Sequence, residues 1–255
     1  MTARILVTGA AGGIGAAAAA ALRTRGCTVT GLDLHAIGDG VLACDVRDPA
    51  QVAVAVGAAI DAMDGLDVLI NCAGVGEVQG AGDAPDADAL ALLDVNLFGA
   101  WRVTAAALPA LRASRGRVVN VASGLAFLTL PLAAAYCASK RALVAYSDAL
   151  RLEHGDAVTV TTVYPGYIRT AIHAKPAAKG VSLEGLVPAE RLEDAAETLV
   201  RAALGRPRRD MATTRRGAVA YALLRALPPS WVDHAVMTAT RRVRSRGSGA
   251  ATRAA

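Results

Sequence analysis

Tyr136 and Lys140 are four residues apart in the stretch Tyr-Cys-Ala-Ser-Lys. On a helix, this spacing places both side chains on one face, one turn apart. A phenol has an unperturbed pKa of about 10, and a nearby ammonium group favours its charged form. At about 4 Å and an effective dielectric of about 20, the attraction is roughly 4 kcal/mol, which corresponds to about 3 pKa units. We therefore predict that Lys140 lowers the pKa of Tyr136 toward neutrality, where a general acid–base works best.

The pattern around this pair decides its meaning, because Tyr-x-x-x-Lys alone is a weak signal that many surface pairs share. Ser123 lies thirteen residues upstream, just after the apolar run at 117–121, and Asn96 lies further upstream. A glycine-rich turn, Thr-Gly-Ala-Ala-Gly-Gly-Ile-Gly over residues 8–15, opens the chain. In this order and at this spacing, the motifs resemble the short-chain dehydrogenase/reductase family over roughly the first 170 residues.

The resemblance implies an α/β fold, a Rossmann-type doubly wound parallel sheet with the site at the carboxyl ends of its strands. It also implies an oxidoreductase that moves a hydride between a nicotinamide cofactor and a secondary alcohol or ketone. In the family pattern, Tyr136 is the general acid–base, Ser123 orients the substrate oxygen, and Lys140 binds the nicotinamide ribose. The backbone of Asn96 would hold a water that joins a proton relay through the lysine.

The glycine-rich turn predicts a dinucleotide site, because it follows an apolar run and precedes a helix-forming run. Small residues there let the backbone approach a pyrophosphate, whose charge then lies at a helix N-terminus. Asp33 ends the next apolar run, 18 residues after Gly15. A carboxylate at this position accepts hydrogen bonds from the ribose hydroxyls of NAD and repels a 2′-phosphate. No arginine directly follows Asp33, so we predict NAD rather than NADP as the cofactor.

Further cofactor contacts follow from the resemblance. An aspartate at position 45 contacts the adenine, and the residue after it lines the adenine pocket. Asn-Cys-Ala-Gly over residues 71–74 resembles the family's Asn-Asn-Ala-Gly, with Cys72 in place of the second asparagine. Its first asparagine braces the sheet, and its glycine lets the ribose approach. Pro-Gly-Tyr-Ile-Arg-Thr over residues 165–170 matches the family's Pro-Gly-x-x-x-Thr, whose Ile168 backbone and Thr170 hydroxyl would hold the nicotinamide carboxamide. The implied cofactor contacts are Gly9, Gly13, Ile14, Gly15, Asp33, Asp45, Val46, Asn71, Ala73, Gly74, Tyr136, Lys140, Pro165, Gly166, Ile168 and Thr170.

The hydrophobic pattern predicts alternating strands and helices that form one catalytic domain over residues 1–204. We expect strands at 4–8, 28–32, 41–43, 67–70, 117–121 and 158–164, and helices at 16–25, 49–63, 87–111, 133–154 and 188–204. Asp48 caps the second of these helices, with Pro49 at its first position. Residues 77–88 predict a polar loop, and residues 171–187, which contain a proline and two glycines, predict a mobile lid over the substrate.

The composition fits one domain with a sizeable core, because 54% of the 255 residues are apolar. Much of this fraction is alanine, which predicts thin, closely packed helices.

The four cysteines have no metal-type spacing and the four histidines form no ligand cluster, so we expect no metal. The N-terminus lacks the features of a signal peptide, so we expect a cytoplasmic protein. Residues 118–139 are uncharged and long enough to span a bilayer, but polar residues and Pro131 interrupt them, which favours a strand, a loop and a helix start.

A basic C-terminal extension, residues 205–255, follows the domain, because residues 201–255 hold twelve arginines and only two acidic residues. Residues 217–227 predict an apolar helix, and the Gly, Ser, Ala and Arg of the last ten or so residues predict disorder. The extension would cover the substrate entrance, rest on an anionic membrane surface, or pack on the sheet or a second subunit. Without a nucleic-acid motif, we expect no nucleic-acid partner. The resemblance implies a homo-oligomer.

Two other functions fit parts of the sequence. A non-catalytic NAD-binding sensor would keep the glycines and Asp33 but would not need all four catalytic positions, so we rank it below the enzyme. A peripheral membrane interaction protein would give the basic extension the main role.

Four apolar residues follow Ser123 and suggest an apolar pocket for a hydrophobic substrate: Leu125, Phe127, Leu128 and Leu130. Packing in the protein core explains these residues equally well.

Overall fold

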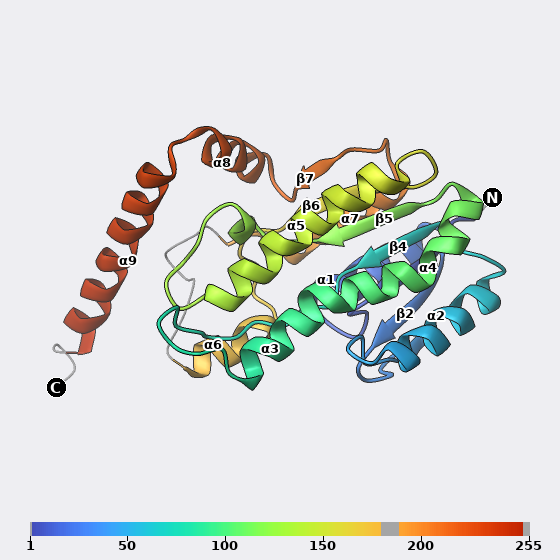
Figure 1. The fold of residues 1–255 in the computed structure, drawn as a ribbon, viewed down its shortest axis with the longest axis horizontal. Helices are drawn as coiled ribbons and strands as arrows, with labels where there is room; N and C mark the ends of the chain where they lie inside the picture. The colour runs from blue at the N-terminus through green and yellow to red at the C-terminus, as the bar shows by residue number, and fades with distance from the viewer. Residues whose placement is uncertain (1, 180–188, 252–255) are drawn as a thin grey trace.

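The computed structural model describes residues 2–179 and 189–251. Its centre is a parallel sheet of seven strands in the order β3-β2-β1-β4-β5-β6-β7 (Figure 1). The strands are β1 Arg4–Thr8, β2 Thr28–Asp33, β3 Val41–Ala43, β4 Val68–Asn71, β5 Arg117–Val121, β6 Thr159–Tyr164 and β7 Asp210–Ala212. The order reverses between β1 and β4, as in a doubly wound sheet. This confirms the predicted fold class, and each of the six predicted strands begins and ends within one residue of its expected position.

Helices cover both faces of the sheet, because successive side chains of each buried strand point to opposite sides. Leu6 of β1 faces the layer formed by three helices: α2 (Pro49–Met63), α4 (Ala100–Ser114) and α5 (Ala134–His154). Its neighbours Ile5 and Val7 face the layer of α1 (Gly13–Thr24) and α7 (Leu192–Leu204). Alanines of α1 and α7 lie in that second core, which agrees with the predicted close packing: Ala18, Ala19, Ala202 and Ala203.

The starts of α1 and α2 follow from local chemistry. The Asp48 carboxylate accepts hydrogen bonds from the backbone N–H groups of Ala50 and Gln51, and Pro49 is the first helical residue. This confirms the predicted cap. Helix α1 begins at Gly13, three residues earlier than predicted, because the extended backbone of Gly12 lets the helix start inside the glycine-rich turn.

A long helix that carries Asn96 crosses one face of the sheet. Helix α3 (Ala87–Leu93) continues through a π-helical turn, η1 (Asp94–Gly99), into α4. By length and composition, Ala87–Ser114 is the one helix among the described residues that would be able to span a membrane. Its side chains at Val103, Ala107 and Leu111 are instead fully buried in the sheet core. It is therefore a core helix of this domain.

The uncharged stretch 118–139 folds as predicted. It forms β5, a 3₁₀ turn, η2 (Gly124–Ala126), and the first part of α5. The predicted helix at 133–154 is confirmed to within one residue by α5.

The chain after β6 departs further from the sequence-based expectation. A 3₁₀ turn, η3 (Ala171–His173), and a short helix, α6 (Ala174–Ala178), form the first part of the predicted lid segment, and residues 180–187 lie outside the described residues. Helix α7 begins at Leu192 rather than 188. Strand β7 was not predicted, because it has only three residues and begins with an aspartate.

The basic extension is helical. Helix α8 (Arg215–Ala226) agrees with the predicted apolar helix. Helix α9 spans Pro229–Ala251, and residues 252–255 lie outside the described part. The disorder of the last ten or so residues stays a prediction. In Figure 1, α8 lies beside the end of the sheet that holds β7, while α9 extends away from the sheet.

Candidate active site

The predicted site residues lie at the carboxyl ends of the central strands. The glycine-rich turn follows β1, the Asn-Cys-Ala-Gly segment begins in β4, Ser123 follows β5, and the Pro-Gly segment follows β6. The strands are parallel and adjacent, so these four loops meet at one edge of the sheet. Hydrogen bonds join them there: Gly124 N donates to Pro165 O at 2.9 Å, which ties the loop after β5 to the loop after β6.

The first turns of α5 present Tyr136 and Lys140 to this edge. Lys140 is only 4% exposed, and its Nζ donates a hydrogen bond to Val121 O, the last residue of β5, at 3.0 Å. The same Nζ lies 5.8 Å from the centroid of the Tyr136 ring. Ser123 is buried, and its Oγ accepts a hydrogen bond from Leu125 N at 3.2 Å. The structure therefore brings together three of the four predicted catalytic side chains.

The pKa values in this geometry correct one prediction. Burial raises the pKa of Tyr136 to about 12, and a hydrogen bond with Ser123 opposes that rise. Burial also lowers the pKa of Lys140 to about 8. The Lys140 ammonium is directed to the Val121 carbonyl rather than to the phenol oxygen. The prediction that Lys140 lowers the pKa of Tyr136 is therefore wrong for this arrangement, because loss of solvent outweighs the charge of the lysine.

Asn96 occupies the π-helical turn, a feature that often occurs at functional sites. Its side chain is almost fully buried and bonds to both backbone groups of Val75: Oδ1 accepts from Val75 N at 2.8 Å, and Nδ2 donates to Val75 O at 3.0 Å. Nδ2 also donates to Ser139 Oγ at 3.2 Å, on the helix of Tyr136 and Lys140. Asn96 thus joins the loop after β4 to α5. The water relay assigned to its backbone stays a prediction.

The glycine-rich turn forms a cradle that only small residues permit. A Cβ atom on Gly15 would lie 2.1 Å from Gly9 O, and one on Gly9 would lie 2.9 Å from the backbone of Ala73. Gly9 also has a φ of +69°, which disfavours any other residue. Thr8 Oγ1 accepts hydrogen bonds from Cys72 N and Ala73 N, both at 3.0 Å, which holds the two loops together. This close backbone packing fits the pyrophosphate site of a dinucleotide.

The remaining cofactor residues lie around this cradle. Asp33 ends β2, and its Oδ2 accepts a hydrogen bond from Ala11 N at 2.9 Å. Asp45, assigned to the adenine, binds Arg47 at 2.6 Å, and this hydrogen bond lowers the pKa of its carboxyl group. A Cβ atom on Gly13 would lie 3.6 Å from the side chain of Thr170, so the glycine-rich turn meets the predicted nicotinamide segment. Of the other predicted contacts, Ile14 lies in the first turn of α1, Gly74 and Ile168 lie on the loops after β4 and β6, and Val46 follows β3.

Asn71 braces the sheet through a polar chain that the sequence did not reveal. Its Nδ2 donates to Asn120 Oδ1 at 2.8 Å and to Thr104 Oγ1 at 2.9 Å. Asn120 Nδ2 in turn donates to Ser147 Oγ at 2.9 Å. All four residues are buried, so the chain fixes β4 and β5 against α4 and α5. The sequence signal for Asn120 is an asparagine within an otherwise apolar strand.

Two acidic residues beside the site were also missed. Glu77, in the predicted polar loop, is buried and forms an ion pair with Lys179 at 2.7 Å, which connects that loop to the residue after α6. Glu190 Oε2 accepts a hydrogen bond from Gly166 N at 2.9 Å, in the Pro-Gly segment. A buried carboxylate needs such partners, but nothing in the sequence indicates which partners it has.

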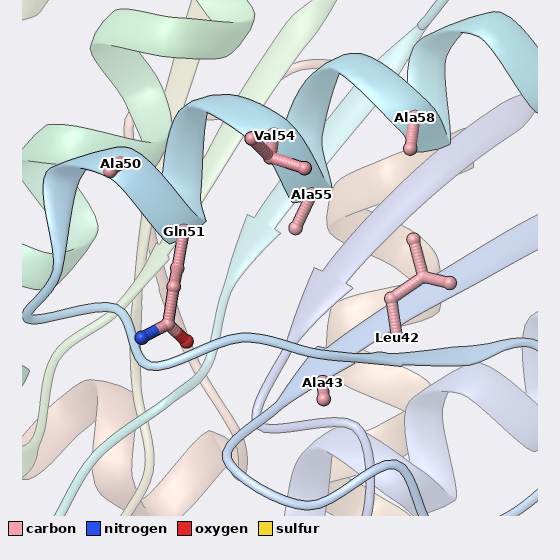
Figure 2. A pocket seen from close by; sticks show the side chains of 7 residues that line it. All are labelled: Leu42, Ala43, Ala50, Gln51, Val54, Ala55 and Ala58. Atoms are coloured by element: carbon pink, nitrogen blue, oxygen red, sulfur yellow. The ribbon is translucent and has the colours of Figure 1, made fainter.

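An apolar hollow of about 470 Å³ lies elsewhere, between β3 and α2 (Figure 2). The figure shows the Gln51 side chain beside it as the one polar group among alanines, Leu42 and Val54. Gln51 is already bound to Asp45 N and to the Asp48 carboxylate. None of the predicted site residues lines this hollow. Within residues 2–179 and 189–251, no group of three His, Cys, Asp or Glu side chains is placed to hold a metal ion.

Known proteins resemble this chain in sequence. Residues 3–179 match the family described as short chain dehydrogenase. D-threitol dehydrogenase of Mycolicibacterium smegmatis is 36% identical over 204 residues, which cover 73% of this chain and 78% of that protein. The 11-beta-hydroxysteroid dehydrogenase 1A of Arabidopsis thaliana is 32% identical over 184 residues, which cover 66% of this chain and 53% of that protein.

Solved structures share the fold. A short chain dehydrogenase from Burkholderia cenocepacia J2315, solved in complex with NADP, is 27% identical and has a TM-score of 0.77 over 92% of this chain and 98% of its own. The aldohexose dehydrogenase of Thermoplasma acidophilum, in ligand-free form, is 25% identical and has a TM-score of 0.75 over 83% of this chain and 92% of its own.

Proposed function

We propose that this chain, which belongs to the short-chain dehydrogenase family and acts on CH–OH groups, interconverts hydrophobic secondary alcohols and ketones with NAD(H). The observation that carries the proposal is the meeting of Ser123, Tyr136 and Lys140 at the strand ends beside a glycine cradle. The family and the fold support an NAD(P) cofactor in general. The choice of NAD and of a hydrophobic substrate are our inferences from particular residues.

Each residue of the site has a separate role in the proposed reaction. A bound nicotinamide cofactor would accept the hydride in oxidation and supply it in reduction. Ser123 Oγ donates a hydrogen bond to the substrate oxygen and stabilises the charge that develops there. Tyr136 Oη donates its proton to the substrate oxygen in reduction and becomes a phenolate. In oxidation the phenolate form takes the hydroxyl proton and becomes the neutral phenol again. Because burial keeps the phenol protonated at neutral pH, Tyr136 is already in the form that reduction requires.

Lys140 acts mainly by position. Val121 O holds its ammonium group at 3.0 Å, next to Gly74, whose Cβ would lie 3.5 Å from Nζ. An ammonium held there faces the segment that the ribose of the cofactor approaches, and it would donate hydrogen bonds to the ribose hydroxyls. Asn96 fixes the same region by bonding to Val75 and Ser139.

The apolar side chains after Ser123 support a hydrophobic substrate. Leu125 and Leu128 are half-buried, in the loop that directly follows the predicted oxygen-binding residue. Leu130 is instead buried, and Phe127 packs against Tyr164 and Tyr221, so core packing explains these two. The test is a panel of secondary alcohols and ketones that ranges from threitol to steroids, followed by the absorbance of the reduced nicotinamide. Turnover of polyols with none of apolar alcohols would contradict the hydrophobic assignment, and turnover of neither would contradict the proposed reaction.

We further propose that the protein is a homo-oligomer. Exposed apolar side chains on η1, α4 and α5 support this, because Phe98 is 45%, Trp101 50% and Leu152 87% exposed. Aromatic residues that stand on a surface favour burial against a partner. Light scattering of the full chain gives the mass directly, and a monomer at micromolar concentration would contradict the proposal.

The outer face of the basic extension supports contact with an anionic membrane surface. Val219 and Leu223 of α8 and Trp231 of α9 are all more than half exposed, and Arg215 and Arg216 at the start of α8 are exposed beside them. Apolar side chains next to arginines suit an interface with acidic lipids. We also propose that the protein is located in the cytoplasm, where it would meet the inner, acidic surface of the membrane.

A further inference from the structure

We propose that α8 forms one wall of the substrate site, and that Tyr221 contacts the substrate beside Ser123 and limits the bulk that the site admits there. The inference rests on the proposed function, because it takes Ser123 as the residue that binds the substrate oxygen. It assigns a role in selectivity to a residue of the C-terminal extension, which lies outside the part of the chain that matches the family.

The contact that carries the inference is between Tyr221 and Gly124. Gly124 directly follows Ser123, and a Cβ atom on Gly124 would lie 2.3 Å from the Tyr221 hydroxyl oxygen and 2.8 Å from its ring. The phenol end of Tyr221 therefore fills the space that a side chain at position 124 would take. Because Gly124 N is bonded to Pro165 O, this space lies where the loops after β5 and β6 meet.

A carboxylate holds the start of α8 against the same loops. Glu190 Oε2 accepts a hydrogen bond from Gly166 N, and Oε1 accepts one from Thr214 Oγ1 at 2.9 Å. Thr213 Oγ1 also donates to this carboxylate. Thr214 caps α8, since its Oγ1 accepts from Gly217 N at 3.0 Å. Glu190 thus fixes the first turn of α8 to the Pro-Gly segment of the predicted nicotinamide site.

A second anchor lies one turn after Tyr221. The Arg225 guanidinium lies 4.6 Å from the centroid of the Phe127 ring and forms an ion pair with Asp210 at 3.4 Å. The three rings of Tyr221, Phe127 and Tyr164 contact one another, with centroids 5.1 Å apart for Tyr221 and Phe127, 4.6 Å for Phe127 and Tyr164, and 6.2 Å for Tyr164 and Tyr221. This aromatic cluster places α8 on the loop that follows Ser123, with Tyr221 between two fixed points.

The burial of α8 shows which face is turned inward. Gly217, Tyr221 and Leu224 are half-buried and share one side of the helix, while Val219 and Leu223 point outward with 62% and 56% exposure. The Tyr221 hydroxyl has no hydrogen-bond partner among the described residues. Burial raises its pKa to about 12, so the hydroxyl is neutral at neutral pH. A half-buried hydroxyl to which none of these residues is hydrogen-bonded is available to contact a ligand.

The experiment compares kcat/KM for isopropanol, cyclohexanol and cyclododecanol in full-length variants. Tyr221→Ala should raise the ratio of kcat/KM for cyclododecanol over isopropanol by about 10-fold or more, since a few methylene groups change discrimination by that much. Tyr221→Phe should keep the wild-type ratio, because the ring remains. Leu223→Ala, on the exposed face of the same helix, is the matched control and should leave the ratio within about 2-fold.

A double-mutant cycle tests the contact itself. Gly124→Ala should weaken turnover and lower the Tm, because its methyl group meets the Tyr221 hydroxyl. Gly124→Ala combined with Tyr221→Ala should recover most of that loss, a non-additivity typical of touching residues. Additive effects on the Tm would overturn the contact, and an equal effect of Tyr221→Ala on all three alcohols would overturn its role in selectivity. Failure of the proposed function looks different: the wild-type protein would turn over none of the alcohols, while the Tm cycle would still decide the contact.

Discussion

Lys140 shows how burial changes the chemistry expected from residue spacing. The spacing of Tyr136 and Lys140 correctly predicted that both lie on one face of a helix, at the carboxyl ends of the strands. The sign of the pKa change did not follow, because burial raises the pKa of Tyr136 and lowers that of Lys140. Spacing contains no information on desolvation, which depends on the loops that fold over the helix.

Tyr136→Phe should reduce turnover by at least about 100-fold while cofactor binding persists, because only the hydroxyl that moves the proton is removed. The measurement is kcat/KM together with titration of the cofactor by fluorescence. Tyr146→Phe is the matched control, since this tyrosine lies on the same helix but stacks on Trp101. Substantial activity in the Tyr136→Phe enzyme would show that another group moves the proton.

The reduction reaction should be independent of pH up to about pH 8 and slower above it. Tyr136, with a pKa of about 12, stays protonated throughout, whereas Lys140 loses its charge as the pH rises through about 8. The check is the pH profile of kcat/KM for a ketone. In Lys140→Arg the charge persists at all these pH values, so any remaining activity should lack the alkaline decline. A decline near pH 8 that survives this substitution would assign it to another group.

The enzyme should use NAD with a higher kcat/KM than NADP, because the Asp33 carboxylate would repel a 2′-phosphate. Asp33→Asn should narrow that preference by about 10-fold, since it removes the charge and keeps an oxygen that accepts from Ala11 N. Asp39→Asn, in the exposed loop after β2, serves as the control. Equal use of both cofactors by the wild-type protein would contradict the assignment.

Among the elements, those buried in the sheet were the most predictable. Apolar runs predicted strands β1 to β6 within one residue, and the signal is strongest in the central strands, because a parallel strand there is covered on both faces. Asn96 gave a different kind of signal, because an asparagine within a helix is unfavourable and often marks an irregularity. In the structure, Asn96 lies in a π-helical turn between α3 and α4. Strand β7 lacks such a signal, because its three residues begin with an aspartate, unlike the apolar Val-Leu-Ala of β3. The last part of helix α9 lacks one because it is rich in Gly, Ser and Arg.

Glu190 should be important for the docking of α8. Glu190→Ala removes hydrogen bonds to Gly166, Thr213 and Thr214. Hydrogen bonds to a charged group contribute about 1.5–3 kcal/mol each, so the Tm should fall by at least about 4 °C. Glu193 is exposed, and its one ion pair among the described residues is with Arg191. Glu193→Ala should therefore change the Tm by less than about 1 °C. Equal Tm values for the two variants would mean that α8 is held by its aromatic contacts.

At the scale of the whole molecule, the charge is divided between an acidic catalytic body and a basic extension. Residues 1–200 have a net charge of −5, since the chain as a whole has +5 and residues 201–255 supply +10. The structure adds that α8 has two different faces, one docked on the loop after Ser123 and one exposed. The same helix would therefore border the substrate site and meet the surroundings of the protein. Sequence alone left these two roles as alternatives, because it does not show which side of the helix is covered.

The full-length protein should sediment with phosphatidylserine vesicles at low salt and should be released as salt is added. Each arginine near an acidic lipid surface contributes about 1 kcal/mol, and salt screens that attraction. Helix α8 has 12 residues, too few to cross a bilayer, so contact would remain at the surface. Trp231→Ser and the charge reversal Arg215→Glu should each weaken binding, whereas Trp101→Ser on the distant α4 should not. If the wild-type protein stays in the supernatant at low salt, the exposed face of α8 and α9 serves a protein partner instead, and the mass from light scattering would show whether that partner is a second copy of the chain.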